Sequence, residues 1–549
     1  MSVLMTPFAR LLEALVHTPA RGAKLRLLRD YFATTPDPDR GFALAAFAGG
    51  ETVPALTASV FRALAEERVD PVLFRLSHDF VGDLAETVSL IWPAPATDGA
   101  APRLSAVVDA LRAAPRAGRT AVVAALFDAM GPGERFALVK LCSGALRVGV
   151  SARLVRTALA EMGGVSLERL EELWFGLSPP YTDLFRWLEG GPEPGVDLAL
   201  SYRPMMLAHP VEAFLYSAAE MRENAENDAE TLSRLAGRLD PADFLAEWKW
   251  DGIRVQAVAQ GEGRALYSRT GEDLAPAFPD LVEAMTWQGC VDGELLVARD
   301  GAAAPFAELQ KRLNRKRVSA RDLADRPALI RAYDLLHDGR TDLRPLPLAE
   351  RRSRLEAWVA AQAPARVDVS PLVAFEDWGT LARLRDGARD AAQEGLMLKR
   401  RDSAYQGGRP MGPWFKWKRA PLTADCVLLY AQRGHGKRSS FYSDYTFGAW
   451  RDGPEGPELA PVGKAYSGFT DAELSRLDRF VRDNTTDRFG PVRAVRPALV
   501  LEIAFDAVQE STRHKSGIAM RFPRIRRIRW DKPAAEADRL ETLLRMVRG

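Results

Sequence analysis

Apolar residues recur at helical spacing through the first third of the chain, between breaks made by Pro and Gly. The clearest sets are Phe8-Leu11-Leu12-Leu15, Leu104-Val107-Val108-Leu111 and Val122-Leu126. Steps of three and four residues place side chains on one face of an α-helix. The pattern therefore predicts an all-α domain over residues 1–188.

The segment EGGPEPGVD (189–197) is poor in apolar residues and rich in Gly and Pro. This composition is typical of a linker between domains. We expect a linker over residues 189–202 and a second domain that begins at residue 203.

From residue 203 the pattern changes to short alternating segments, such as 245–249 and 254–258, with frequent turn dipeptides. Alternation of this kind predicts strands, and we expect an α+β domain over residues 203–420. Beyond Pro421 the chain has further short strands, the Gly/Pro loop RDGPEGPELAP (451–461) and a basic end. These features predict a small β-barrel of the OB-fold type over residues 421–549.

Length and composition agree with several folded domains. A chain of 549 residues is too long for one core, and 47% hydrophobic with 27% charged residues is ordinary for a folded protein. No stretch approaches 18 uninterrupted apolar residues, so we expect a cytoplasmic protein that does not enter a membrane. The three cysteines lie too far apart for a CxxC metal or redox motif.

The net charge of +2 does not by itself indicate a nucleic-acid partner. Basic residues are concentrated locally, because residues 488–549 contain 14 Lys or Arg against 7 Asp or Glu. A solvated strand face explains such a cluster as well as a binding surface does, so charge alone leaves both open.

The segment AEWKWDGIRVQAV (246–258) places Lys249 inside a predicted strand, directly before an Asp-Gly turn. One explanation is a lysine on an edge strand. The other is a nucleophile, since an amine that attacks phosphorus must be unprotonated, and burial or nearby cations favour that form. Candidate cations occur in PWFKWKR (413–419), where Lys416 and Lys418 share one face of a strand.

The order of several segments resembles that of the covalent nucleotidyltransferases, and specifically of ATP-dependent DNA ligases. The segments are KWDGIR (249–254), SRTGED (268–273), VDGEL (291–295), AYDLL (332–336), EGLMLK (394–399), FKWKR (415–419) and RFPRIRRIRWDK (521–532). Seven motifs in the family's order are difficult to obtain by chance.

The resemblance implies ATP as the cofactor, Mg²⁺ as the metal with Mn²⁺ as a substitute, and Lys249 as the catalytic nucleophile. It places Glu247 at the adenine, Arg254 near the ribose or phosphates, and Tyr333 as a stacking ring. Glu294 and Glu394 match carboxylates that bind the ribose or the divalent ion.

The resemblance also implies a set of phosphate-binding cations: Arg269, Arg409, Lys416, Lys418, Arg521 and Arg524. Arg409 is separated from Lys416 by one residue more than is usual, so its equivalence depends on the alignment of that loop. We expect Arg521 and Arg524, together with Lys532, to orient the leaving pyrophosphate; the alternative is that this arginine run grips DNA.

Segment LCSGALRVGVSARLVRTAL (141–159) resembles the helical DNA-binding domain of archaeal and eukaryotic replicative ligases. Arg147 then becomes a contact to the DNA backbone; without the match it would be a helix-surface arginine. The layout resembles the bacterial ligases called the B form. This implies a monomer that acts on nicked duplex DNA in repair, recombination or replication, beside a nuclease or helicase.

Four alternatives remain to be weighed. RNA ligases and guanylyl-transferring capping enzymes share the first motif, but the helical segment 1–188 argues against them. Use of NAD⁺ is disfavoured because that helical segment does not resemble the NAD⁺-recognition domain. A catalytically dead nick-binding scaffold is disfavoured by the intact Lys249, Glu294, Lys416 and Lys418.

Overall fold

The computed structural model describes residues 5–49, 52–94, 101–144, 146–196, 198–217, 220, 228–299, 301–313, 315, 318–390, 393–433, 442–466, 471–512 and 514–548. The chain divides into two compact units. The first comprises Met1–Gly164, Pro179–Gly191 and Pro421–Gly549, and the second comprises Val165–Ser178 and Pro192–Ala420. Within the described ranges, no helix is long and apolar enough to cross a membrane.

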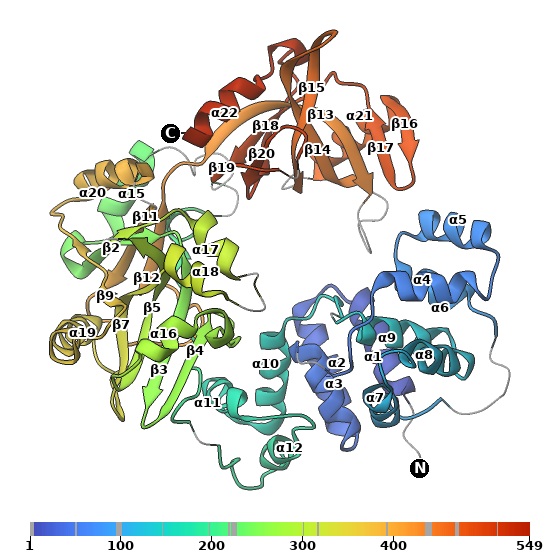
Figure 1. The fold of residues 1–549 in the computed structure, drawn as a ribbon, viewed down its shortest axis with the longest axis horizontal. Coiled ribbons are helices and arrows are strands. Elements are labelled where there is room, and N and C mark those ends of the chain that lie inside the picture. The colour runs from blue at the N-terminus through green and yellow to red at the C-terminus, as the bar shows by residue number, and fades with distance from the viewer. Residues whose placement is uncertain are drawn as a thin grey trace. The chain divides into compact units, whose positions relative to one another are not determined.

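The N-terminal part of the first unit is helical and is drawn in blue to teal in Figure 1. Its helices are α1 (Thr6–His17), α2 (Arg21–Thr34), α3 (Asp39–Ala48), α4 (Ala58–Glu66), α5 (Pro71–Val81), α6 (Leu84–Ile91), α7 (Leu104–Ala113), α8 (Arg119–Asp128), α9 (Pro132–Cys142), α10 (Ala152–Gly163) and α12 (Thr182–Leu188). The prediction of a helical N-terminal region is confirmed. The predicted domain boundaries remain predictions.

The apolar sets predicted on α1 and α7 are buried, as their spacing requires. On α8 the spacing is right, but the fully buried residues are Val123 and Phe127, one position after Val122 and Leu126. Polar residues begin several helices: the carboxylates of Asp70 and the hydroxyl of Ser151 accept from backbone N–H groups in the first turns of α5 and α10. Such caps satisfy donors that a helix leaves unpaired.

The C-terminal part of the first unit is a β-sheet structure, drawn in orange to red in Figure 1. Its elements are β13 (Leu422–Arg433), β14 (Tyr442–Gly453), β15 (Gly456–Tyr466), α21 (Asp471–Asp483), β16 (Thr485–Phe489), β17 (Val492–Val495), β18 (Val500–Phe505), β19 (Ala507–Glu510), β20 (Ile518–Arg521), β21 (Arg524–Arg529), η6 (Ala534–Glu536) and α22 (Leu540–Arg548). The strand order is β14-β15-β21-β18-β13-β17-β16, and β13 also pairs with β14, so five of the strands form a closed ring around a common core.

The loop predicted over residues 451–461 is wrong. These residues continue β14 and β15, which pair with each other from Asp444 and Tyr466 down to Gly453 and Gly456. The other neighbour of β15 is β21, and the two strands pair only at Tyr466. Positions 457 and 461 therefore lie on an unpaired edge, where proline, which has no backbone N–H to donate, is tolerated.

The second unit contains two sheets, green to light orange in Figure 1. One has the order β1-β12-β11-β2-β10 and the other β4-β3-β5-β7-β8, with β6 and β9 paired at its margins. The strands are β1 (His209–Pro210), β2 (Phe244–Trp250), β3 (Ile253–Gln260), β4 (Gly263–Ser268), β5 (Gly289–Arg299), β6 (Ala302–Ala303), β7 (Ala328–Asp338), β8 (Thr341–Asp342), β9 (Val367–Val369), β10 (Leu372–Val373), β11 (Gln393–Arg400) and β12 (Trp414–Lys418). The α+β prediction for this part is confirmed.

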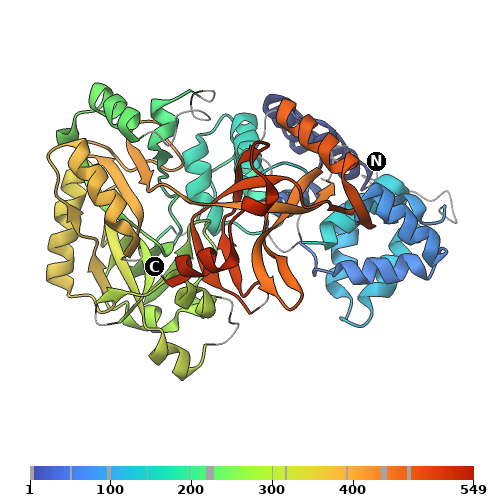
Figure 2. The same ribbon diagram turned by 90° about the horizontal axis from the view of Figure 1, so that it is seen from above.

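Helices cover the sheets of the second unit. They are α11 (Leu167–Leu173), η1 (Trp174–Gly176), α13 (Val211–Leu215), α15 (Asp228–Arg238), η2 (Pro241–Asp243), η3 (Ala275–Ala277), α16 (Pro279–Ala284), α17 (Phe306–Leu313), α18 (Ala320–Asp325), α19 (Leu348–Gln362), α20 (Trp378–Asp386) and η4 (Gly387–Asp390). Each sheet has its own core: α16, α17 and α19 pack on the sheet with β5 and β7, whereas α13, α15 and α20 pack on the sheet with β2 and β11. Figure 2 shows the same ribbon from above.

The Asp-Gly turn after Lys249 joins the two sheets; it is not a hairpin turn. It leads from β2, in one sheet, to β3, in the other. A Cβ atom at Gly252 would lie 2.5 Å from the backbone oxygen of Leu295, so only glycine fits this close approach. Because both sheets extend from this turn, it brings the end of β2 close to β5.

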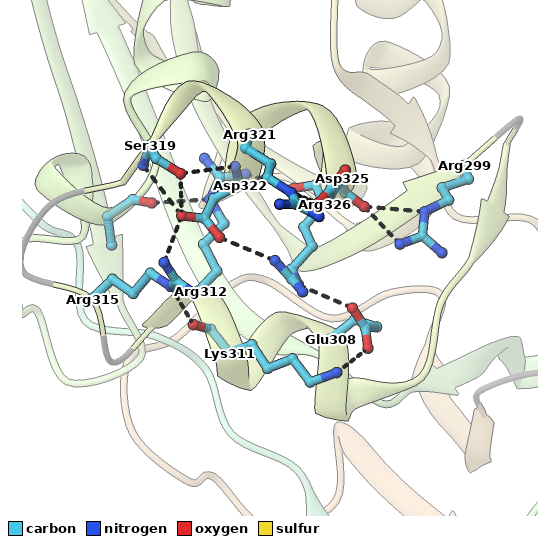
Figure 3. A network of polar contacts seen from close by, with 11 residues as sticks. Arg299, Glu308, Lys311, Arg312, Arg315, Ser319, Arg321, Asp322, Asp325 and Arg326 are labelled. Atoms are coloured by element: carbon cyan, nitrogen blue, oxygen red, sulfur yellow. Dashed lines mark hydrogen bonds and ion pairs between the residues drawn. The ribbon is translucent and has the colours of Figure 1, made fainter.

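Helices α17 and α18 are joined by a network of charged side chains, which Figure 3 shows. Asp322 accepts hydrogen bonds from the side chains of Ser319, Arg315 and Arg326, at 2.6, 2.8 and 3.1 Å. Arg326 also binds Glu308 on α17 at 3.0 Å. Arg299 at the end of β5 donates to the backbone oxygen of Asp325 on α18 at 2.6 Å, so the network also connects the helices to that strand.

Candidate nucleotide-binding site

A cleft between the two sheets of the second unit has a volume of about 420 Å³. It is lined by Leu207, Ala208, Glu247, Trp248, Lys249, Trp250, Gly252, Ile253, Arg254, Arg269, Glu294, Tyr333, Met397, Lys399, Trp414, Lys416 and Lys418. Most of these residues come from β2, β11 and β12 of one sheet and from β3, β5 and β7 of the other.

The strand period explains how distant parts of the sequence meet in the cleft. Met397 on β11 lies directly beside Glu247 on β2 and Lys416 on β12, so all three share one face of the sheet. Lys249 and Lys418 follow at steps of two on the same face. The predicted grouping of Lys249, Lys416 and Lys418 is therefore present in the structure.

Lys249 is held at the end of β2 by a carboxylate. Its Nζ donates to Oε2 of Glu394 at 2.5 Å, and Nζ of Lys418 lies 3.3 Å from the same oxygen. The three side chains are only partly buried, with exposed fractions of 24%, 17% and 40%. An incoming ligand can therefore reach the Lys249 amine from the cleft.

Positive charge is concentrated around Lys416. Burial lowers the pKa of Lys416, and the charges of Arg409, Lys418, Lys249 and Arg269 lower it further. Neighbouring cations repel one another. This repulsion is relieved when a ligand with several negative charges binds among them. The cleft is suited to a polyphosphate.

Glu294 lies on β5 directly opposite Arg254 on β3. Burial of its carboxyl group, offset only in part by the charges of Lys249 and Arg254, raises the pKa of Glu294 to about 8. Glu294 lines the cleft, and the negative charge of Glu394, which is paired with Lys249, further raises the pKa of Glu294. Such a pair of acidic groups favours a cation between them.

Arg254 belongs to a buried polar network. Its guanidinium binds Asp292 through two hydrogen bonds, of 3.0 and 2.6 Å, and donates to the backbone oxygen of Met206 at 2.6 Å. The hydroxyl of Tyr405 donates to Asp292 at 2.6 Å, and the Asp292 side chain is fully buried. Arg254 is thus fixed in one orientation before any ligand binds.

A second buried pair forms one wall of the cleft. Lys399 on β11 donates to Glu247 at 2.9 Å, and each side chain is only 2% exposed. Arg352 lies 3.5 Å from the other oxygen of Glu247. The Lys399 ammonium stands 4.4 Å from the centre of the Tyr333 ring, so Glu247 and Tyr333, which are predicted to bind one base, both contact the same lysine.

The structure leaves other predicted residues outside the cleft lining. Arg409 is exposed in the loop after β11, close enough to affect Lys416. Arg147 lies in the loop between α9 and α10 and has a left-handed φ of 50°. The alternative to a DNA contact was an arginine on the surface of a helix. Arg521 and Arg524 lie in the first unit, at the end of β20 and the start of β21, and Lys532 there binds Asp425 at 2.8 Å.

Sequence reasoning did not single out Asp292, Tyr405, Lys399, Arg352 or Met397. Asp292 had a signal, because it stands two residues before Glu294 on the same strand. Lys399 likewise stands at the end of the quoted segment EGLMLK. No signal in the sequence connects Arg352 and Tyr405 with the cleft, since they reach it from α19 and from a loop.

Comparison with known proteins agrees with this geometry. Residues 206–418 match the family model of the ATP-dependent DNA ligase domain, and residues 438–532 match that of the ATP-dependent DNA ligase C-terminal region. A probable DNA ligase of Opitutus terrae is 33% identical over 98% of this chain and 62% of its own length. A probable DNA ligase of Saccharopolyspora erythraea is 34% identical over 90% of this chain and 94% of its own length.

A solved structure named Pmar-Lig_PreS3 has the same overall fold, with a TM-score of 0.59 and 15% identity over 95% of this chain and 99% of that one. The fold and the cleft agree with a nucleotidyltransferase. The chain belongs to the ATP-dependent DNA ligase family, whose members seal nicks in DNA with ATP. The chain spans less than two thirds of the Opitutus protein.

Proposed function

We propose that this chain seals nicks in duplex DNA through a lysyl-AMP intermediate on Lys249. The observation that carries the proposal is the position of the Lys249 amine, in a cleft whose other cations include Arg269, Lys416 and Lys418. A nucleophile surrounded by phosphate-binding groups suits attack on a bound nucleotide.

The nucleotide is proposed to bind with its base beside Tyr333 and Glu247 and its ribose or α-phosphate beside Arg254. The buried Glu247 carboxylate accepts hydrogen bonds, which suits the exocyclic amine of adenine. The β- and γ-phosphates then extend toward Lys416, Lys418 and Arg269. Arg409 is proposed as a further phosphate ligand at the edge of this group.

In the first step the lone pair of Lys249 Nζ forms a bond to the α-phosphorus of ATP. The bond between that phosphorus and the bridging oxygen breaks, pyrophosphate leaves, and the nitrogen loses its proton. Before this attack the Lys249 ammonium must leave its ion pair with Glu394 and give up one proton to solvent, which makes the lone pair available. The cations around it stabilise the charge that develops on the leaving group.

In the second step the 5′-phosphate at a nick attacks the same phosphorus and releases the lysine, which regains a proton. In the third step the 3′-hydroxyl attacks the activated 5′-phosphorus and AMP leaves. Both partners must be held in line, so positioning is the main contribution of the protein.

Glu294 and Glu394 are the residues proposed to hold Mg²⁺, with Mn²⁺ as a substitute. Two carboxylates suit this ion, because Mg²⁺ in nucleotide enzymes is usually held by one or two carboxylates together with phosphate oxygens and water. When bound, the ion neutralises phosphate charge. Glu394 would then serve both the ion and Lys249, whose amine donates to its Oε2 at 2.5 Å.

The remaining parts of the proposal concern DNA. We propose that the closed ring of strands in the C-terminal part is an OB-fold, that Arg147 contacts the DNA backbone, and that the protein works as a monomer beside a nuclease or helicase. The ring of five strands and the exposure of Arg147 support the first two points.

The test is incubation with radiolabelled ATP, Mg²⁺ and nicked duplex DNA, following labelled protein and sealed product on one gel. We expect Lys249→Ala to abolish the labelled protein and to leave nicked-DNA binding largely intact, because most duplex contacts lie elsewhere. Lys464→Ala, at an exposed lysine of β15, is the matched control and should label fully. Labelling of the Lys249→Ala protein would refute the proposal.

A further inference from the structure

Helix α11 lies in the second unit although the helices on either side of it in the sequence lie in the first. Glu172 on α11 binds Arg344 at 2.7 Å, and Arg344 also binds Asp342 on β8 at 2.7 Å. The pKa of Glu172 is lowered, because the charges of Arg344 and Arg169 outweigh the burial that raises it. Charged contacts thus fasten α11 to the sheet of β7 and β8.

Three aromatic rings continue this attachment after α11. The ring of Phe175 meets that of Tyr202 edge to face with centres 4.5 Å apart, and Tyr202 meets Tyr267 on β4 at 5.9 Å. Phe175 and Tyr267 lie 6.5 Å apart. Edge-to-face rings at such distances attract one another, so the cluster is a packed unit.

The cluster supports the turn that carries Arg269. The Tyr202 hydroxyl donates to the backbone oxygen of Arg269 at 2.7 Å. Burial raises the pKa of Tyr202 to about 12, so the hydroxyl keeps its proton and acts as the donor. Gly271 in the same turn has a φ of +86°, and a Cβ atom there would lie 2.1 Å from the Phe175 ring. Tyr202 and Phe175 therefore both contact the turn, at Arg269 and at Gly271.

We propose that Tyr202 and Phe175 are positioning residues for Arg269. The Arg269 side chain is exposed at the edge of the cleft, so its own contacts do not fix its direction. The position of Arg269 is fixed by the backbone of the turn, which Tyr202 and Phe175 contact. A cation placed in advance binds phosphate without first losing conformational freedom. This inference rests on the proposed function, in which Arg269 binds a phosphate of ATP or of the nick.

The chain offers a matched pair of variants. Tyr202→Phe and Tyr267→Phe each remove a partly buried hydroxyl that donates to a backbone oxygen, that of Arg269 at 2.7 Å and that of Leu200 at 2.8 Å. Both rings stay in the same cluster, so the two variants should lose similar thermal stability. Only Tyr202→Phe should change catalysis.

Single-turnover rates are measured for two steps: labelling of the protein over a range of ATP concentrations, and transfer of AMP from labelled protein to nicked DNA. Arg269→Ala identifies the step that Arg269 serves. We expect Tyr202→Phe to weaken the same step about two- to tenfold, mainly through the half-saturating concentration of ATP or nick, as loss of one hydrogen bond implies. Tyr267→Phe should match the wild type.

The outcomes separate the inference from the function on which it rests. If Arg269→Ala changes neither step, the assignment of Arg269 as a phosphate ligand is wrong. If Arg269→Ala is defective while Tyr202→Phe and Tyr267→Phe behave alike, the positioning role is overturned. Variants of Phe175 provide a second test. Phe175→Ala should weaken the step that Arg269→Ala weakens. Phe175→Leu, which keeps an apolar side chain beside Gly271, should retain most of the wild-type rate of that step.

Discussion

At the scale of single residues, Asp292 shows how a buried charge positions a ligand-binding group. Its carboxylate is fully buried, binds Arg254 through two hydrogen bonds and accepts a third from Tyr405. Removing one partner of such a pair leaves the other charge uncompensated. The orientation of Arg254 thus depends on a residue that is not part of the cleft lining.

We predict that Asp292→Asn lowers the free energy of unfolding by roughly 2 to 4 kcal/mol, because the amide leaves the Arg254 charge unpaired. It should also raise the ATP concentration needed for half-maximal labelling of Lys249. Denaturant unfolding and labelling kinetics measure the two effects. Asp338→Asn, at an exposed residue of the neighbouring strand β7, is the control and should change neither quantity.

His337 gives a prediction about pH. Burial lowers its pKa to about 4 although Asp342 lies 3.7 Å away, and its Nε2 atom has no hydrogen-bond partner. The folded protein therefore binds this proton less readily than the unfolded chain, whose histidine has a pKa near 6.5. The stability that follows is present above pH 6.5 and is lost as the pH falls toward 4.

We expect acid to lower the free energy of unfolding of the native protein by on the order of 2 kcal/mol more than that of a His337→Gln variant between pH 6.5 and pH 4. Urea unfolding at a series of pH values measures the difference. Parallel pH profiles would show that His337 does not titrate in this range. His514, exposed in the C-terminal part, is the control position for the same substitution.

Some residues of the cleft could be predicted from the sequence, namely those that belong to a motif or to an alternating strand. The motif order pointed to Lys249, Glu294, Lys416 and Lys418, and period two placed the lysines of β12 on one face. Lys399 was missed because a lysine at the end of an alternating strand usually lies in solvent, and only pairing of β11 with β2 buries it beside Glu247. That pairing joins residues about 150 positions apart, which no local pattern reports.

At the scale of elements, α11 is the informative case. Its sequence is amphipathic like that of its neighbours, so periodicity predicts a helix but does not report which unit the helix packs on. The contacts that decide this, Glu172 with Arg344 and Phe175 with Tyr202, involve residues on later parts of the chain. A boundary at residue 188 follows from composition alone and does not take these contacts into account.

Two deletions test the role of α11. A boundary at residue 188 predicts that removal of residues 1–188 leaves labelling of Lys249 unchanged. We expect instead that a protein lacking residues 1–164 labels normally, whereas one lacking residues 1–188 melts roughly 5–10 °C lower and labels more slowly, because it loses α11 and Phe175. Differential scanning calorimetry and the labelling assay check this. Equal behaviour of the two proteins would show that α11 is dispensable.

At the scale of the whole molecule, the chain passes between the two units four times, at residues 164–165, 178–179, 191–192 and 420–421. The order of the seven motifs was sufficient to predict the family, since it depends on the sequence alone. The strands that carry the last motif, β20 and β21, belong to a different unit from the cleft. Their contribution to the reaction therefore has to be tested by function.

Arg521 and Arg524 frame Phe522, whose φ is +51° and whose side chain is 66% exposed. Arg524 lies 3.5 Å from Asp506, and the Arg521 guanidinium stands over the Phe522 ring. We hypothesise that, with a hinge near Pro421, these arginines reach the nucleotide in the first step and stabilise the leaving pyrophosphate, which only that step produces. The alternative is that they grip DNA throughout.

We predict that the double change of Arg521 and Arg524 to Ala slows labelling from ATP by at least about tenfold, as loss of two phosphate contacts implies. The same protein should still seal much of a nick supplied already adenylylated, because that substrate bypasses pyrophosphate release. Arg526 and Arg527, exposed on the same strand, provide a double alanine control with an equal loss of charge. If the Arg521 and Arg524 variant labels normally but fails on the pre-adenylylated nick, the arginines bind DNA and the pyrophosphate hypothesis is wrong.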